Sequence, residues 1–274
     1  MTGELCDCFL NRQQGVYAIL DAVSAVAGDR PVQIWSAIDG FVDMQHAREN
    51  PIHIASANWH ALASWLAQLH PGQRNILIDT GSTTTDIIPM IDGIVAANGK
   101  TDAQRLVEHE LVYLGGSLTP LMALSARMHG ALMNEFFATM LDLAVVIGAC
   151  PQQPDNNDSP DGRPYDTASC LRRLLRMVGQ DLNDDWQMSD YQHVVACLLD
   201  AAVGMIRSAF DVVAHRHEPI QTVIVSGSGS WLPCRMLAEH ASSFEVIELQ
   251  TLGDQASSTC ACARALLGLA CQLD

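Results

Sequence analysis

The chain has 274 residues, of which 49% are hydrophobic and 17% are charged, a composition typical of a globular protein with one large domain or two lobes. Its 15 Lys and Arg against 31 Asp and Glu give a formal net charge of −16, which argues against nucleic acid or an anionic membrane as the main partner. No basic and apolar leader opens the sequence, and polar residues interrupt its apolar stretches, so we expect a soluble, cytoplasmic protein. Its nine cysteines, an odd number, then indicate reduced thiols.

Two helices and a strand are predicted in the N-terminal quarter. Apolar residues at helical spacing predict a helix with one buried face over residues 15–27. A strand over residues 32–37 and a second helix over residues 58–70 follow. Asn58, at the start of that helix, either caps it or contacts a ligand, and the capping role is favoured.

A hairpin of two strands joined by a small polar turn is predicted over residues 75–95. An apolar run ends at Asp79, six Gly, Ser and Thr residues follow, and Asp86 opens a second apolar run. Gly81 permits a backbone with positive φ, which would let the amides and hydroxyls of the turn converge on a phosphate. The other turn residues are Ser82, Thr83, Thr84 and Thr85. The two aspartates flank this volume with the oxygen ligands that Mg²⁺ prefers. The alternative is a Thr-rich hairpin that binds nothing.

A capping box and a long polar loop mark the middle of the chain. Thr101 and Gln104 have the spacing of a capping box and predict the start of a helix. A short strand over residues 111–113 and a buried helix over residues 134–146 follow. Residues 151–165 are rich in Pro and Asp and predict a mobile surface loop, an excursion rather than a lid. Three arginines after it predict a solvated helix face rather than an anion clamp: Arg172, Arg173 and Arg176.

The last third of the chain predicts a second loop able to bind an anion. A long helix over residues 190–215 leads to a buried strand over residues 222–225, a Gly/Ser turn and the start of another helix. This order favours an anion at the helix N-terminus, although tight turns use the same residues. The candidate residues are Gly227, Ser228, Gly229 and Ser230. A strand over residues 244–249 and a helix over residues 256–273 close the chain.

Two hydroxyl-rich loops, each following an apolar strand, fit a two-lobed α/β fold. The segment DTGSTTTDIIP resembles the phosphate-binding hairpin of the hydantoinase A/oxoprolinase branch of the actin, Hsp70 and sugar-kinase superfamily, which has a ribonuclease H-like fold. The segment VSGSGSWLP resembles its later loop on the nucleotide or phosphate side. The segments MTGELCDCF, SANWHALA, GKTDAQRL, ELVYLGGSLTPL and DGRP together resemble the tetrahydromethanopterin-linked one-carbon transfer pathway proteins, relatives of a methanofuran-biosynthesis synthase.

The resemblance implies a transferase that condenses an aminomethylfuran methyl diphosphate with a tyramine- or tyrosine-type phenol and releases diphosphate. It implies that Asp79 and Asp86 hold Mg²⁺, that the hairpin hydroxyls bind the diphosphate, and that residues 228–230 bound its other side. Ionisation of a furfuryl diphosphate gives a stabilised cation, so the protein supplies charge neutralisation and positioning more than a nucleophile.

Residues close to the resembling segments are candidates for substrate contact. They are Glu4, Asn58 and Lys100. The base that deprotonates the phenol stays open among Glu4, Asp7 and Lys100.

The first segment of the chain predicts an incomplete N-terminal sheet. Members of the resembling family carry a strand and an Asp-x-Gly-Gly-x-Asn loop ahead of the MTGEL segment, which here begins at Met1. We therefore expect residues 1–74 to be the remainder of the first lobe and residues 75–274 to be the second lobe. Exposed strand edges would favour a homo-oligomer or aggregation. Two other functions stay open: an ATP-dependent kinase or hydrolase of the hydantoinase type, and an inactive subunit that binds a partner through the exposed edge.

Overall fold

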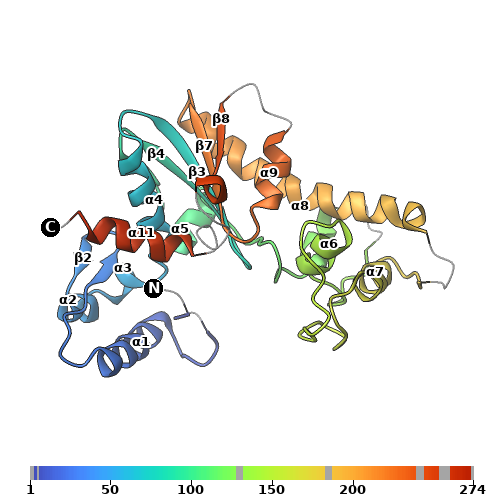
Figure 1. Ribbon diagram of the computed structural model, residues 1–274, viewed down its shortest axis with the longest axis horizontal. Helices are drawn as coiled ribbons and strands as arrows, with labels where there is room; N and C mark the ends of the chain where they lie inside the picture. The colour runs from blue at the N-terminus through green and yellow to red at the C-terminus, as the bar shows by residue number, and fades with distance from the viewer. Residues whose placement is uncertain are drawn as a thin grey trace.

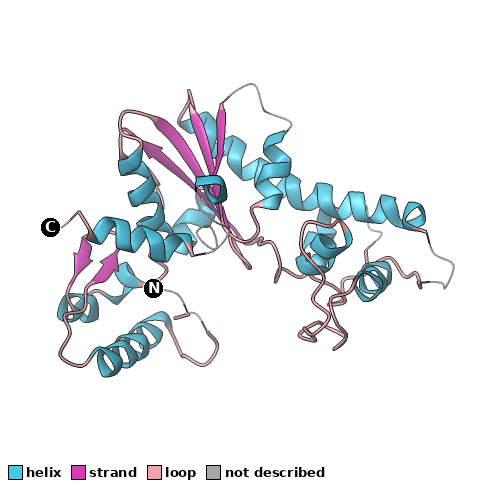
Figure 2. Cartoon of the chain, in the orientation of Figure 1, coloured by secondary structure: helices cyan, strands magenta, loops and turns pink. Residues whose placement is uncertain are grey.

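A mixed β-sheet lies at the centre of the chain, with helices on both of its faces (Figures 1 and 2). The computed structural model describes residues 3–4, 6–127, 132–182, 187–238, 244–252 and 260–272. The strands run in the order β5-β4-β3-β7-β8, and β6 also pairs with β4. Their bounds are β3 (Arg74–Thr80), β4 (Thr85–Ile91), β5 (Ile94–Val95), β6 (Leu111–Val112), β7 (Thr222–Ser226) and β8 (Glu245–Glu248). The mixed α/β class predicted from the sequence is confirmed.

The predicted hairpin is formed by β3 and β4. The two strands are antiparallel, and their register pairs Asp79 with Asp86 and Thr80 with Thr85. β3 also pairs with β7 in the parallel direction, with Asp79 opposite Ser226. The carboxyl ends of parallel neighbours lie at the same edge of a sheet, so the two hydroxyl-rich loops that follow β3 and β7 are brought together.

Alternate residues of each strand enter two different cores, as the two-residue period of a strand requires. Ile76 and Ile78 of β3 lie in the core beneath α8 (Met188–Arg216) and α9 (Trp231–Leu237). Leu77 lies in the opposite core, beneath α4 (Asn58–Leu69) and α11 (Ala261–Ala270). Asp79 alternates in step with Leu77, and Asp86 with Ile88, so both carboxylates belong to the face that α4 and α11 cover.

Helix α8 is long and apolar enough to cross a membrane by length and composition, with a mean hydropathy of 1.5 over its best window. Asp200, Arg207 and Asp211 interrupt its apolar residues, in agreement with the sequence-based expectation. Core helices share this composition, and in this fold 44% of the window is buried. Leu198, Ala202 and Ile206 pack beneath the sheet. The far end of α8 runs beyond the sheet to α6 and α7 (Figure 1).

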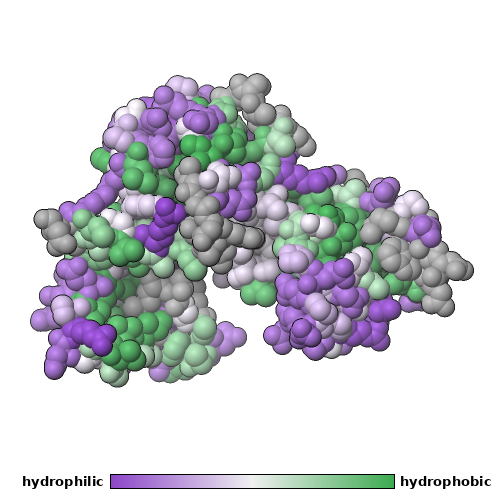
Figure 3. All heavy atoms as spheres, viewed as in Figure 1, coloured by the Kyte–Doolittle hydropathy of each residue, from purple (hydrophilic) through white to green (hydrophobic). Residues whose placement is uncertain are grey.

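The N-terminal segment folds into a small unit below the sheet in Figure 1. It comprises α1 (Arg12–Ala27), β1 (Ile34–Ser36), β2 (Gly40–Val42), α2 (Met44–Glu49) and α3 (Pro51–Ile54). The expectation of one buried face on α1 is only half right. Val16 and Leu20 are buried, but Val23 and Val26 are 39% and 84% exposed because no described element covers that part of the helix. Figure 3 shows apolar surface in this region.

An arm formed by the middle of the chain lies beside the far end of α8. It comprises α6 (Met140–Val146) and α7 (Thr167–Arg176), joined by residues 151–165, and follows α5 (Asp102–Val107) and the 3₁₀ helix η1 (Leu121–Arg127). The helix predicted over residues 134–146 begins only at Met140, because Thr139 forms a capping box with Asp142. A 3₁₀ helix, η3 (Leu249–Leu252), follows β8.

The arm also overturns the prediction of a solvated arginine face. Arg173 is fully buried, and its guanidinium binds Asp142 at 2.7 Å and Asp161 at 2.8 Å. Asp161 belongs to the polar loop 151–165, so Arg173 fastens that loop to α6. The ion pair between buried Arg173 and Asp161 therefore holds this polar loop against α6 and α7.

Candidate phosphate and substrate site

The turn between β3 and β4 has its carbonyl groups bound by a second segment, residues 115–119. The amide of Gly116 donates to the carbonyl oxygen of Gly81 at 2.8 Å, and the amide of Leu118 donates to that of Ser82 at 2.8 Å. A Cβ on Gly115 would overlap the backbone of Ser82, so glycine is needed for this approach. The 115–119 segment therefore fixes the orientation of the turn's peptide groups.

The amides of the same turn face the other way. Gly81 N–H donates to Thr84 O at 2.9 Å, which closes the turn. The N–H groups of Ser82, Thr83 and Thr84 donate to no residue in the part of the chain that the structure describes. Consecutive free amides form the concave donor set that binds phosphate oxygens in other proteins. Their availability agrees with the phosphate-binding prediction for these three residues.

Two details of the predicted turn are wrong. Gly81 does not adopt a positive φ, which among these loops is found instead at Gly227, with φ of +92°. The Thr85 hydroxyl does not face the turn, because it is buried and donates to Leu114 O at 2.7 Å. Thr85 therefore belongs to the paired strands β3 and β4 and not to the anion site.

The second loop lies against the first and supports it. The amide of Gly229 donates to Thr80 O at 2.8 Å, and the Ser226 hydroxyl donates to Asp79 Oδ1 at 2.5 Å. A Cβ on Gly227 would overlap Thr80 O, and one on Gly229 would lie within 2.9 Å of the backbone of Gly116. The predicted proximity of the two loops is thus confirmed.

The second loop has few groups left for an anion. Gly229 is buried with its amide occupied, and Ser230 N–H donates to Gly227 O at 3.2 Å. Ser228 is exposed, and α9, which begins at Trp231, has only seven residues and no side-chain cap. The loop therefore acts mainly as a support for Asp79 and the hairpin turn.

The two aspartates have unequal surroundings. Burial raises the pKa of Asp86, but the Arg105 guanidinium forms an ion pair with its Oδ1 and opposes the rise. Burial also raises the pKa of Asp79 to about 6; the Ser226 hydroxyl opposes this change and the charge of Asp86 adds to it. No guanidinium or ammonium group of the described residues forms an ion pair with Asp79.

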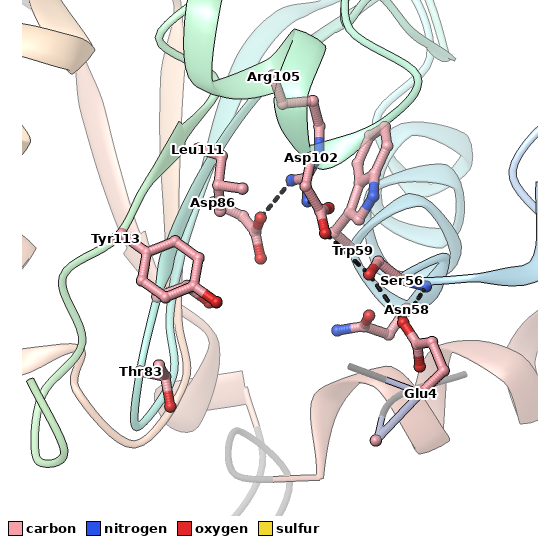
Figure 4. A pocket seen from close by; sticks show the side chains of 12 residues that line it. Glu4, Ser56, Asn58, Trp59, Thr83, Asp86, Asp102, Arg105, Leu111 and Tyr113 are labelled. Atoms are coloured by element: carbon pink, nitrogen blue, oxygen red, sulfur yellow. Dashed lines mark hydrogen bonds and ion pairs between the residues drawn. The ribbon is translucent and has the colours of Figure 1, made fainter. Parts of the chain in front are cut away.

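A cavity of about 240 Å³ opens between the hairpin turn, α4 and the N-terminal segment (Figure 4). Thr83, Asp86 and Tyr113 lie along one side of it, and Asn58 and Glu4 lie on the other, as Figure 4 shows. The residues that line it are Gly3, Glu4, Ser56, Asn58, Trp59, Thr83, Thr84, Asp86, Asp102, Arg105, Leu111 and Tyr113. Its volume suits a small ring rather than a large ligand.

The comparisons with known proteins decide the family. The hydantoinase/oxoprolinase family model matches residues 1–268. The chain belongs to the hydantoinase/oxoprolinase family. It is 32% identical over 266 residues to the (4-{4-[2-(gamma-L-glutamylamino)ethyl]phenoxymethyl}furan-2-yl)methanamine synthase of Methanocaldococcus jannaschii, and the match covers 94% of this chain and 77% of that protein. A stretch of 113 residues is 41% identical to the synthase of the same name from Methanococcus vannielii and covers 39% of this chain and 50% of that one.

Solved structures of other proteins align with this family member at low sequence identity. Nucleotide-free acetone carboxylase aligns with 92% of this chain at a TM-score of 0.55 and 15% identity, and the match covers 39% of the carboxylase chain. An archaeal actin homolog aligns with 81% of this chain and 56% of its own, at a TM-score of 0.41 and 14% identity. The match to acetone carboxylase supports the α/β fold class predicted from the sequence.

The structure places some of the predicted substrate-contact residues at the cavity and not others. Glu4 and Asn58 line the cavity. Asn58 is not the cap of α4, because Ala57 occupies the cap position without a side-chain hydrogen bond. Lys100 is exposed, its ammonium group donates to Ala97 O at 3.0 Å, and it does not line the cavity.

Sequence reasoning missed several charged and aromatic residues of the cavity. Arg105 stacks on Trp59 at 4.3 Å and binds both Asp86 and Asp102. The spacing of Asp102 and Arg105, three residues apart just inside a capping box, indicates an intrahelical pair. It carries no information that the arginine reaches Asp86 on a strand, because that contact depends on tertiary packing.

Proposed function

We propose that this protein is a synthase that joins an aminomethylfuran, activated at a methylene carbon, to the phenol oxygen of a tyramine derivative. The observation that carries the proposal is the set of free amides at Ser82, Thr83 and Thr84, which opens beside a small cavity rich in carboxylates. The names of the two related synthases describe such a product, an aryl ether between a furan methylene and a phenol that bears a glutamylaminoethyl arm.

The proposed reaction exchanges one bond to the furan methylene for another. The carbon–oxygen bond to a diphosphate leaving group breaks, a carbon–oxygen bond to the phenol oxygen forms, and the phenol proton is released. Leaving-group departure puts negative charge on the diphosphate and positive charge on the furan methylene. The first charge would be met by the free amides of the hairpin turn, and the second by the carboxylates of the cavity.

The cavity residues are suited to a developing cation. Asp86, Asp102 and Glu4 line it, and Trp59 and Tyr113 add aromatic surface. A furfuryl cation is flat and delocalised, so carboxylates fixed around it lower its energy without moving. Thr83 and Thr84 line the same cavity, so the leaving group and the ring are held in one site. The translational and rotational entropy of bringing them together is then lost on binding rather than in the reaction step.

The residues present also fit an Mg²⁺ ion near Asp79 and Asp86. Asp79 has a raised pKa and no cationic partner among the described residues, which is the electrostatic condition that a bound cation relieves. No group of three or more His, Cys, Asp or Glu in the described ranges could hold a metal by itself. Phosphate oxygens and water would therefore complete the coordination, and the ion would supply neutralisation of the leaving diphosphate.

An assay with two sets of substrates tests the proposal against the ATP-dependent alternative. The full chain with Mg²⁺ is given an aminomethylfuran methyl diphosphate and gamma-glutamyltyramine, or ATP alone, and the products are followed by mass spectrometry and by phosphate and diphosphate assays. We expect the aryl ether and diphosphate in equal amounts, and no ATP turnover. ATP hydrolysis without the furan, with no ether formed, would refute the synthase function.

Matched variants locate the chemistry in the hairpin. Asp79→Asn should lower the rate of ether formation by at least about 100-fold, because it removes one of the two carboxylates that would hold the Mg²⁺ ion that neutralises the leaving diphosphate. Ser228→Ala should change the rate by less than about 3-fold, since Ser228 is exposed and outside the free amide set.

A further inference from the structure

One carboxylate oxygen at the cavity meets no donor within the described part of the chain. Glu4 is 2% exposed, and its Oε1 accepts hydrogen bonds from Ser56 N–H at 2.8 Å and from the Ser56 hydroxyl at 2.9 Å. Its Oε2 is buried and meets no donor among the described residues. A buried carboxylate oxygen without a donor is costly, so a ligand that donates to it would be bound there.

The balance of charges around the cavity is negative. Three carboxylates line it, those of Glu4, Asp86 and Asp102. Arg105 lies between the two aspartates, and Arg12 binds Asp102 at 3.1 Å. Two guanidinium groups and three carboxylates leave a net charge of about −1 around the cavity. A single cation bound at the unpartnered oxygen of Glu4 would balance this charge.

We propose that Glu4 binds the protonated aminomethyl group of the furan substrate and orients the ring. This inference rests on the proposed function, since it names the part of that substrate that the cavity receives. A primary alkylamine is an ammonium ion at neutral pH and has three donors, enough for Glu4 Oε2 and for neighbouring acceptors. A charge-assisted hydrogen bond of this kind is among the stronger polar contacts in proteins.

The arrangement of the cavity matches a ring with two arms. Figure 4 shows Glu4 and Thr83 on different sides of the opening, with Tyr113 and Trp59 on either side of the space between them. An amine arm held by Glu4 therefore directs the activated methylene arm toward the free amides of the hairpin turn. The amine fixes which end of the ring meets the leaving-group site.

The other ammonium group of the reaction fits this position less well. The glutamyl end of the phenolic substrate carries a carboxylate beside its ammonium group, and both guanidinium groups at the cavity are already paired with carboxylates. Its arrival would leave the cavity's excess negative charge in place and add an unpaired carboxylate. The volume of about 240 Å³ also favours the furan over the longer phenol.

A binding experiment with the full chain tests the proposal independently of turnover. The probes are (4-(hydroxymethyl)furan-2-yl)methanamine and an analogue in which an ethyl group replaces the aminomethyl group, with affinities measured by calorimetry or NMR titration. We expect the wild-type protein to prefer the amine by about 10- to 100-fold. Glu4→Gln keeps an acceptor for Ser56 and should reduce this preference to about 3-fold or less.

Two further variants test the charge and provide a control. Glu4→Asp retains the charge and should retain part of the preference, whereas Glu49→Gln removes an exposed carboxylate outside the cavity and should leave the preference within about 3-fold of wild type. Melting temperatures establish that each variant is folded. An undiminished preference in folded Glu4→Gln overturns the proposal, as does equal loss in Glu49→Gln or preferential binding of gamma-glutamyltyramine over tyramine that depends on Glu4.

The failure of this inference and the failure of the proposed function give different results. If the wild-type protein forms the aryl ether and Glu4→Gln keeps its preference for the amine, the function stands and the role of Glu4 is refuted. If no ether forms but the amine preference disappears in Glu4→Gln, the ammonium site stands and the synthase reaction is refuted.

Discussion

Replacing Asp79 by Asn should stabilise the protein at neutral pH in the presence of EDTA. Burial raises the pKa of Asp79 from 3.8 to about 6, so the folded protein disfavours the charged carboxylate. A change of about two pKa units at about 1.36 kcal/mol each gives about 3 kcal/mol, and partial exposure of the side chain to solvent lowers the expected gain to about 1–3 kcal/mol. Asparagine has the same shape and still accepts the hydrogen bond from Ser226.

The gain should depend on pH in a defined direction. Between about pH 4 and pH 6 the folded protein retains a proton on Asp79 that the unfolded chain has released, so the free energy of unfolding of the wild type falls as the pH rises through this window. The Asp79→Asn variant has no such group. The difference in stability between the two proteins should therefore be near zero at about pH 4 and should reach its full value by about pH 7.

Urea or thermal unfolding at several pH values measures this difference, and about 1 kcal/mol corresponds to about 2–4 °C in melting temperature for a chain of this size. Asp92→Asn is the matched control, because Asp92 is exposed at the other end of the hairpin and its φ of 52° suits Asn as well. The control should change the free energy of unfolding by less than about 0.5 kcal/mol. A less stable Asp79→Asn at pH 7.5, or a difference that does not vary with pH, would refute the reasoning.

Three other substitutions or reactions probe the support of the site. Gly229→Ala should lower the free energy of unfolding by about 1–3 kcal/mol, because its Cβ would collide with Thr80 and the 115–119 segment. Gly204→Ala on α8 has no atom near the added Cβ and should raise the free energy of unfolding by about 0.5–1 kcal/mol. Equal effects of the two substitutions in denaturant titrations would contradict this. Arg173→Met should cost about 3–5 kcal/mol by leaving buried carboxylates unpaired, and a similar loss in the neighbouring Arg172→Met would show that the ion pairs are not responsible. Burial and the nearby charge of Asp79 raise the pKa of Cys262 to about 12. Mass spectrometry should therefore find Cys262 unmodified by iodoacetamide at about pH 8, while the exposed cysteines of the N-terminal segment react. Alkylation of Cys262 at the same rate as these cysteines would count against its burial.

The hairpin and its polar turn could be predicted from the sequence because their signals are local. β-branched runs that end at Asp79 and begin again at Asp86 specify two strands and the turn between them, whatever the rest of the chain does. The meeting of the two loops could also be predicted, since each follows a buried strand of an α/β sheet.

Contacts between distant residues could not be predicted in the same way. The pairing of Arg105 with Asp86, the burial of Arg173, and the unpartnered oxygen of Glu4 depend on which helix packs on which face. A charged side chain in a sequence has the solvated surface as its commonest environment, and only the tertiary structure shows when it is buried instead. The same limit applies to the Gly227–Ser230 loop, whose glycines indicated an anion site but serve close packing.

The 115–119 segment is bonded on both of its sides. One side holds the carbonyl groups of the hairpin turn, and the other accepts hydrogen bonds from the start of α6, with Met140 N–H to Thr119 O at 2.9 Å and Leu141 N–H to Ser117 O at 3.0 Å. The turn therefore loses its conformational freedom when the chain folds, before any ligand arrives, and its amides need no rearrangement to receive an anion. The same hydrogen bonds connect the arm to the turn through the 115–119 segment. A rotation of α6 relative to the sheet would therefore turn the peptide planes of the hairpin turn and change the direction in which its amides point.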